Sequence, residues 1–280
     1  MDGSLNSQLV EADERLSRVI SHFYAVQQSA KEPPLAQQML PNYEMILVFN
    51  FGPAMPFQLG NDVYTIRQTA ILGPLRNMLR YTLLPGDDLL VVNFTLDGFY
   101  RLIGKPMQQI SAVDWHKEDG LFDLPYFRDL WEQLAALNSL TDRLQHISRY
   151  AFANLIPVDA AGRSLLDSIP YFRTAAVDPV KGVAATNQVS PRIIQRRFRT
   201  HLGYSAKEMV RFLRFKQVVS FLAQQPSEPV DWLAIVLRFG YHDHSHLISD
   251  FNYFVGISPR RFLRQLGEGS VCISQQGKFY

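Results

Sequence analysis

Four polar side chains between residues 190 and 203 have the types and spacing needed to read DNA. They recur at i, i+3, i+4 and i+7, which places them on one face of a helix: Arg192, Gln195, Arg196 and Arg199. A guanidinium group can donate two parallel hydrogen bonds to guanine, and a glutamine amide pairs in a similar way with adenine. No acidic residue interrupts this face, whereas a merely solvated helix usually mixes both signs of charge. The pattern therefore favours contact with base edges.

The opposite side of the same stretch predicts how this helix is held. Three apolar residues at i, i+4 and i+8 form a candidate buried stripe: Ile194, Phe198 and Leu202. Ser190 is a suitable N-cap, and Pro191 suits the first helical position, where an N–H group would have no partner. We therefore expect a short helix that starts near Ser190 and ends before Gly203.

The charge of the chain is divided along its length. The 280 residues carry a net charge of only +2, but residues 1–170 hold 13 basic against 19 acidic residues, and residues 171–266 hold 14 against 6. A segregation of this kind points to a polyanionic partner for the basic third, because phosphate contacts require local positive charge.

A second stretch of the basic third repeats the organisation of the first. In each stretch a phenylalanine stands five residues before a glycine, and a serine follows the glycine by two: Phe198, Gly203 and Ser205, then Phe251, Gly256 and Ser258. Helical patterns at Val180–Thr186 and Val230–Phe239 precede the two stretches, and a long amphipathic pattern at Ala206–Gln224 joins them.

Residues 171–266 resemble the DNA-binding domain of AraC-type transcriptional regulators. The matching stretches are SPRIIQRRFR (190–199) ahead of GYS (203–205), and FGYHDHSHL (239–247) ahead of Phe251 and GISP (256–259). The resemblance implies two helix-turn-helix units joined by one long helix, with a reading helix of each unit in successive major grooves of double-stranded DNA. It places the base contacts on Arg192, Gln195 and Arg196 in the first unit. In the second unit the matching positions are His244, Ser245 and Ser249.

The second unit departs from the family pattern in its charge. Its reading helix has Asp243 and Asp250 but no lysine or arginine before Arg260. We expect Asp243 to stabilise the helix N-terminus and Asp250 to meet phosphate repulsion near the duplex. The sequence thus predicts weaker reading of DNA by this unit.

Histidines in the second unit invite a metal interpretation that we do not favour. His242 and His246 stand four residues apart, which suits a zinc pair on a helix, but no third ligand is evident. The single cysteine, Cys272, excludes a site built from cysteines. We expect no metal and no cofactor.

The N-terminal part predicts a β-rich domain with helices at its end. Short apolar runs such as Met45–Phe49 and Leu89–Phe94 lie between turn formers in residues 42–102, as in a barrel or sandwich. A helical pattern follows at Tyr126–Leu155, with a break at Asn138-Ser139. The expected fold is α+β and multidomain: a cupin-like barrel or sandwich with trailing helices (1–160), an all-α domain with two helix-turn-helix units (165–266) and a flexible tail (267–280).

Three short motifs within residues 35–155 are LPNY (40–43), Gly73-Pro74 and the stretch from Leu84-Pro85-Gly86 to Gly104. Through these motifs the N-terminal part is similar, more weakly, to the sensor domain of one AraC-type subgroup. That similarity implies a small-molecule effector or a homodimer contact. An alternative is a cupin-like enzyme with a DNA-targeting module, but residues 42–102 lack the histidines of a cupin metal site, and only His22 and His116 precede His146. A regulator that acts mainly through protein contacts is a third interpretation. Our main hypothesis is a non-enzymatic, sequence-specific transcription regulator.

The composition favours a cytoplasmic protein. Hydrophobic residues make up 47% of the chain and charged residues 19%, as in globular proteins. No apolar run reaches the roughly 18 residues that a membrane span requires, and residues 1–14 do not resemble a secretory signal. We therefore expect no membrane contact.

Overall fold

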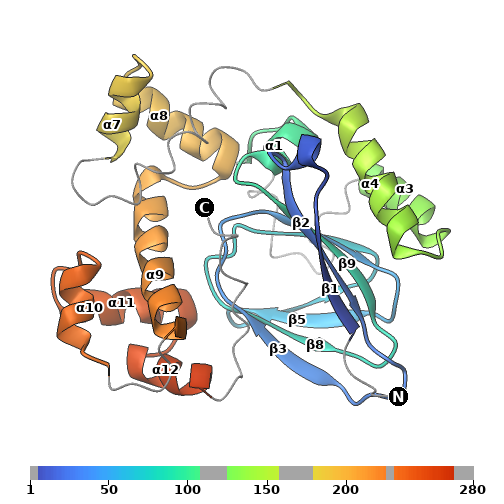
Figure 1. Ribbon diagram of the computed structural model, residues 1–280, viewed down its shortest axis with the longest axis horizontal. Coiled ribbons are helices and arrows are strands. Elements are labelled where there is room, and N and C mark those ends of the chain that lie inside the picture. Colours follow the sequence, from blue (N-terminus) through green and yellow to red (C-terminus); the bar gives the residue numbers. More distant parts are fainter. Residues whose placement is uncertain (1–5, 108–124, 158–178, 225–229, 268–280) are drawn as a thin grey trace.

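The computed structural model describes residues 6–107, 125–157, 179–224 and 230–267. It has a β-rich N-terminal part and a helical C-terminal part, which pack side by side (Figure 1). This is the two-part architecture that the sequence predicts, with strands followed by two trailing helices and then an all-helical part.

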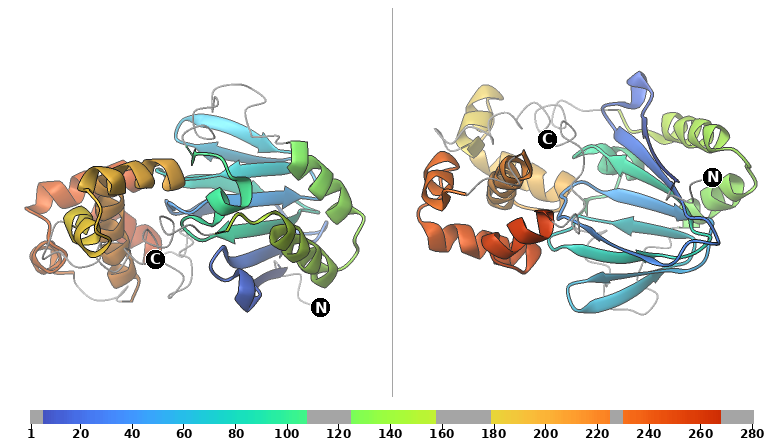
Figure 2. Two further views of the ribbon diagram at one scale, coloured as in Figure 1. Left: turned by 90° about the horizontal axis from the view of Figure 1, so that it is seen from above. Right: turned by 60° about the horizontal axis from the view of Figure 1, so that its bottom comes forward.

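The strands form two antiparallel sheets. The first has the order β1 (Asn6–Glu11), β2 (Ile20–Gln27), β9 (Asp88–Phe94), β4 (Ile46–Asn50) and β7 (Thr69–Leu72). The second has the order β3 (Leu35–Met39), β8 (Leu79–Leu83), β5 (Met55–Leu59) and β6 (Asp62–Ile66). Together they make a sandwich with strand ends directed towards the helical part (Figure 2).

Strand β4 shows why this part of the sequence is almost continuously apolar. Its side chains alternate between two cores, because successive residues of a strand face opposite sides of the sheet. Ile46 and Val48 pack between the two sheets, and Leu47 and Phe49 pack under the helices on the outer face. A strand buried on both faces needs apolar residues at every position.

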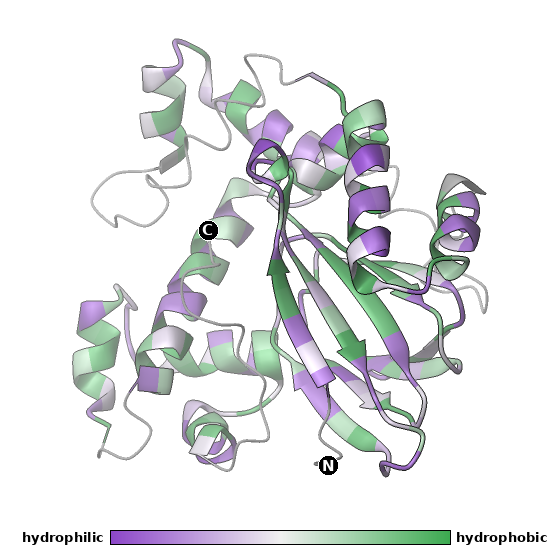
Figure 3. Cartoon of the chain, turned by 45° about the vertical axis from the view of Figure 1, so that its right-hand side comes forward, coloured by the Kyte–Doolittle hydropathy of each residue, from purple (hydrophilic) through white to green (hydrophobic). Residues whose placement is uncertain are grey.

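Three helices cover that outer face: α1 (Gly98–Ile103), α3 (Pro125–Ala135) and α4 (Leu140–Asn154). Helices α3 and α4 are amphipathic, with hydrophilic stretches exposed to solvent (Figure 3). Their break falls where the sequence predicts it, since Ser139 caps α4 by accepting a hydrogen bond from the Asp142 amide (3.0 Å). The indole of Trp131 anchors α3 to the sheet by donating to the Asn50 carbonyl (2.7 Å).

The C-terminal part contains α7 (Pro179–Thr186), α8 (Pro191–Arg197), α9 (Ala206–Gln224), α10 (Trp232–Arg238), α11 (His244–Val255) and α12 (Pro259–Gly267). One turn of π-helix, Phe198–Leu202, extends α8. The long helix α9 stands between the two helix-turn-helix units (Figure 1). Its aromatic residues form the centre of the core, where Phe215 stacks on Phe254 with ring centroids 4.6 Å apart.

The sequence predicts strands only in residues 42–102, but strands β1, β2 and β3 precede that range. Strands β1 and β3 are edge strands whose mixed polar and apolar residues give no clean alternation, and β2 starts without a turn former. The boundary between the two domains, in residues 158–178, and most of the proposed tail, 268–280, lie outside the described residues. No helix in the described ranges is long and apolar enough to cross a bilayer.

Candidate nucleic-acid interface

Helix α8 presents the face that its sequence predicts. Arg192, Gln195 and Arg196 are exposed, whereas the three residues of the apolar stripe are buried in the helical core: Ile194, Phe198 and Leu202. Ser190 stands at the N-cap position before Pro191, but its side chain makes no capping hydrogen bond. The polar face of α8 is therefore exposed and accessible to a ligand.

The π-turn at residues 198–202 changes the direction of the side chains at the end of this helix. Because a π-turn holds an extra residue, it rotates the side chains that follow relative to the α-helical face. Arg199 lies on this turn and is exposed, while His201 is buried and stacks on Tyr100 of α1 with ring centroids 4.2 Å apart. The exposure of Arg199 leaves its side chain accessible, and its role in DNA contact stays a prediction.

The start of α9 is fixed by a reciprocal pair of capping bonds. The Ser205 hydroxyl accepts from the Glu208 amide (3.2 Å), and the Ser205 amide donates to the Glu208 carboxylate (2.8 Å). Burial acts to raise the pKa of Glu208, but the Ser205 bonds and the charges of Arg76 and Arg199 outweigh it and lower the pKa. Glu208 is therefore an anionic neighbour of the first reading helix.

Helix α11 places the three predicted residues of the second unit on its surface. His244, Ser245 and Ser249 are all exposed. Asp243 is the N-cap, as predicted, and its carboxylate accepts from the His246 amide (2.8 Å). Exposure makes these side chains available to DNA, and their base-reading roles stay a prediction.

Asp250 does not face solvent, which corrects the expectation of phosphate repulsion. It is 0% exposed and forms ion pairs with two arginines of α9, Arg211 at 2.6 Å and Arg214 at 3.3 Å. Arg211 also lies over the Tyr253 ring, 4.1 Å from its centroid. The sequence could not distinguish this inward carboxylate from an outward one because its partners lie 36 and 39 residues away. Asp250 anchors α11 to α9.

The zinc pair considered for the second unit does not form. His242 precedes α11, which begins at His244, so His242 and His246 do not share a helix face. His246 instead shares a hydrogen bond between its Nε2 atom and Arg214 (2.9 Å). Within the described ranges, no three side chains of the metal-ligating types gather into a site.

The two parts of the chain share one apolar core, which sequence reasoning missed. Four residues of the N-terminal part belong to the core of the C-terminal helices: Leu40, Tyr43, Met78 and Leu96. Tyr43 stacks on Tyr204 (centroids 4.5 Å apart) and packs edge-on against Phe212 of α9 (4.2 Å). No local pattern signals such a contact, since an aromatic residue after a turn has the same spacing whether it faces its own sheet or another domain.

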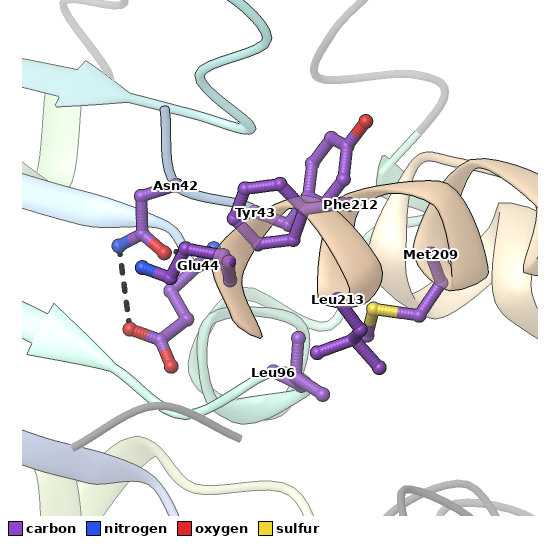
Figure 4. A pocket seen from close by; sticks show the side chains of 8 residues that line it. Asn42, Tyr43, Glu44, Leu96, Met209, Phe212 and Leu213 are labelled. Atoms are coloured by element: carbon purple, nitrogen blue, oxygen red, sulfur yellow. Dashed lines mark hydrogen bonds between the residues drawn. The ribbon is translucent and has the colours of Figure 1, made fainter. Parts of the chain in front are cut away.

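A small cavity lies beside Tyr43, between the sheets and α9 (Figure 4). It has room for about one water molecule, about 10 Å³, and is far too small for a small-molecule ligand. Glu44 and Lys216 line it, and the Asn42 amide donates to the Glu44 carboxylate (3.3 Å). Burial raises the pKa of Glu44 to about 7 and lowers the pKa of Lys216 to about 8, while their mutual attraction opposes both shifts.

We expect stability to depend on pH through these two groups. Because the native pKa of Glu44 is raised, the native state binds more protons than the unfolded state between about pH 4.5 and 7, so the free energy of unfolding falls as the pH rises through that range. Above about pH 8 it rises again, because the pKa of Lys216 is lowered. The double variant Glu44→Gln/Lys216→Met should flatten both limbs in urea unfolding measured at several pH values. Glu14→Gln, an exposed carboxyl, is the control, and an unchanged profile in the double variant would contradict the assignment.

Two different protein families match the two parts of the chain. Residues 183–265 match a family described as "Helix-turn-helix domain", and residues 8–114 match a "Domain of unknown function (DUF6597)". No curated protein sequence matches the chain significantly.

Several solved structures are distantly similar to the chain. ToxT from Vibrio cholerae O395 is 11% identical, with 94% of this chain and 97% of that chain covered at a TM-score of 0.41. ToxT bound to (E)-4-(8-methylnaphthalen-1-yl)but-3-enoic acid is 12% identical, with 93% and 99% covered, at 0.41. The AraC-like transcriptional activator CuxR is 10% identical, with 76% and 86% covered, at 0.26.

Proposed function

Because the chain belongs to the AraC-type family of helix-turn-helix transcription regulators, we propose that α8 and α11 read one double-stranded site, with α8 as the stronger reader. The observation that carries this proposal is the exposed face of α8, with Arg192, Gln195 and Arg196 and no acidic side chain. Helix α11 offers only neutral side chains and histidines at its matching positions, His244, Ser245 and Ser249. We therefore assign most of the base preference to the first unit.

The N-terminal part is the proposed regulatory domain. It shares a core with the DNA-binding part, so a change in its packing would reach both units through α9. We propose that a small-molecule effector or a homodimer contact supplies that change, in the cytoplasm and without an enzymatic step. The cavity of this chain would need to widen to admit a ligand of drug size.

Binding of full-length protein to DNA is expected to weaken steeply with salt. Each neutralised phosphate contributes a slope of about −0.9 in a plot of log affinity against log salt concentration, so roughly five phosphate contacts would give a slope of about −4 to −5. The test selects a site from a random DNA pool with the purified protein and then measures its affinity between low and physiological salt. Affinity that does not change with salt, or a pool that yields no site, would overturn the proposed function.

A further inference from the structure

One loop of the N-terminal part contacts both helix-turn-helix units. This bridging loop, residues 73–78, connects β7 to β8. Two backbone hydrogen bonds between Asn42 and Leu75 (3.0 and 2.6 Å) hold it in the N-terminal part. Leu75 packs in the core between the sheets, and Met78 packs in the core of the C-terminal helices. The loop is therefore anchored at both sides of the domain junction.

Arg76 of the bridging loop reaches the end of the first reading helix. Its guanidinium donates to the Gly203 carbonyl (3.5 Å) and pairs with the Glu208 carboxylate (3.4 Å). Gly203 ends the π-turn with φ +76°, and Pro74 lies against it. The last carbonyl groups of a helix have no partner within the helix and carry partial negative charge, which a cation stabilises.

Asn77 makes the matching contact to the second reading helix. With its amide nitrogen towards α11, it donates to the Tyr253 carbonyl (3.0 Å). Tyr253 lies in the last turn of α11, so this carbonyl also lacks a partner within the helix. Nearly one turn earlier in α11, Asp250 ties the same helix to Arg211 and Arg214 of α9.

Two adjacent donors of one loop thus meet the C-terminal ends of the two reading helices. Helix α9 joins the two units and, with its 19 residues, is about 28 Å long, and successive major grooves lie about 34 Å apart on one face of DNA. Both reading helices fit one duplex only when their relative position is correct. Helix α9 by itself supports each of them from one side only.

We infer that Arg76 and Asn77 are positioning residues for DNA recognition, which hold the two reading helices at the separation and angle that set the spacing of the two half-sites. This inference rests on the proposed function. Both side chains are exposed, so their contacts add little to stability, and their effect lies in the geometry of the reading helices.

The test compares full-length wild-type protein with Arg76→Ala/Asn77→Ala on duplexes that carry the selected site with its two half-sites at the native spacing or moved by one or two base pairs. Wild-type protein should prefer its native spacing. In the double variant that preference should fall about threefold to tenfold, as expected for the loss of two hydrogen-bonded contacts, with little change in Tm. Arg76→Lys, which keeps a cation at the Gly203 carbonyl, should restore part of the preference.

Arg80→Ala is the matched control, since it removes an exposed arginine from β8, the strand that follows the bridging loop. It should leave the spacing profile unchanged. If the double variant keeps the wild-type profile, or binds all spacings more tightly by one common factor, the loop does not position the helices and the inference is wrong. Failure of wild-type protein to select any site would instead count against the proposed function.

Discussion

Replacing Asp250 with alanine is expected to lower the free energy of unfolding by about 3 kcal/mol. The carboxylate is fully buried and binds both Arg211 and Arg214. Its removal leaves two arginines beside the core without their counter-charge. Urea unfolding of the purified variant measures the loss.

Asp243→Ala is the control, because it removes an acidic residue from the same unit at an exposed N-cap. We expect it to cost much less. DNA binding supplies a second readout. If Asp250 faced the duplex, Asp250→Asn would keep stability and raise affinity for all DNA sequences, and that result would contradict the structure.

Arg196→Ala is expected to cost about 1–3 kcal/mol of binding free energy at the selected site and to relax base preference at one or two positions. Arg196 is exposed on the acid-free face of α8. A guanidinium that reads guanine contributes to specific binding and much less to binding of random DNA. Competition between selected and random duplexes separates the two contributions.

Arg196→Lys distinguishes base reading from simple charge attraction. Lysine keeps the positive charge but loses the planar pair of donors, so it should retain most binding to random DNA and lose preference at the same base pairs as alanine. If alanine weakens binding to selected and random DNA equally, Arg196 is only a phosphate contact.

The sequence by itself determined the local elements of this protein. The apolar stripe of α8, the run of β4, the break before α4 and the bounds of α9 follow from periodicity and from capping residues, which act within a few positions of the chain. The exposed polar face of α8 follows from the same periodicity. Charge segregation and two matching stretches were enough to assign the C-terminal part to DNA binding.

Only the tertiary structure decided which way several polar residues point. Asp250 is an anchor because Arg211 and Arg214 approach it from another helix, and His201 is buried because it stacks on Tyr100 of α1. Tyr43 and the bridging loop pack against the C-terminal helices for the same physical reason. Contacts between residues tens or hundreds of positions apart depend on how preformed elements pack, and no local spacing in the sequence records that packing.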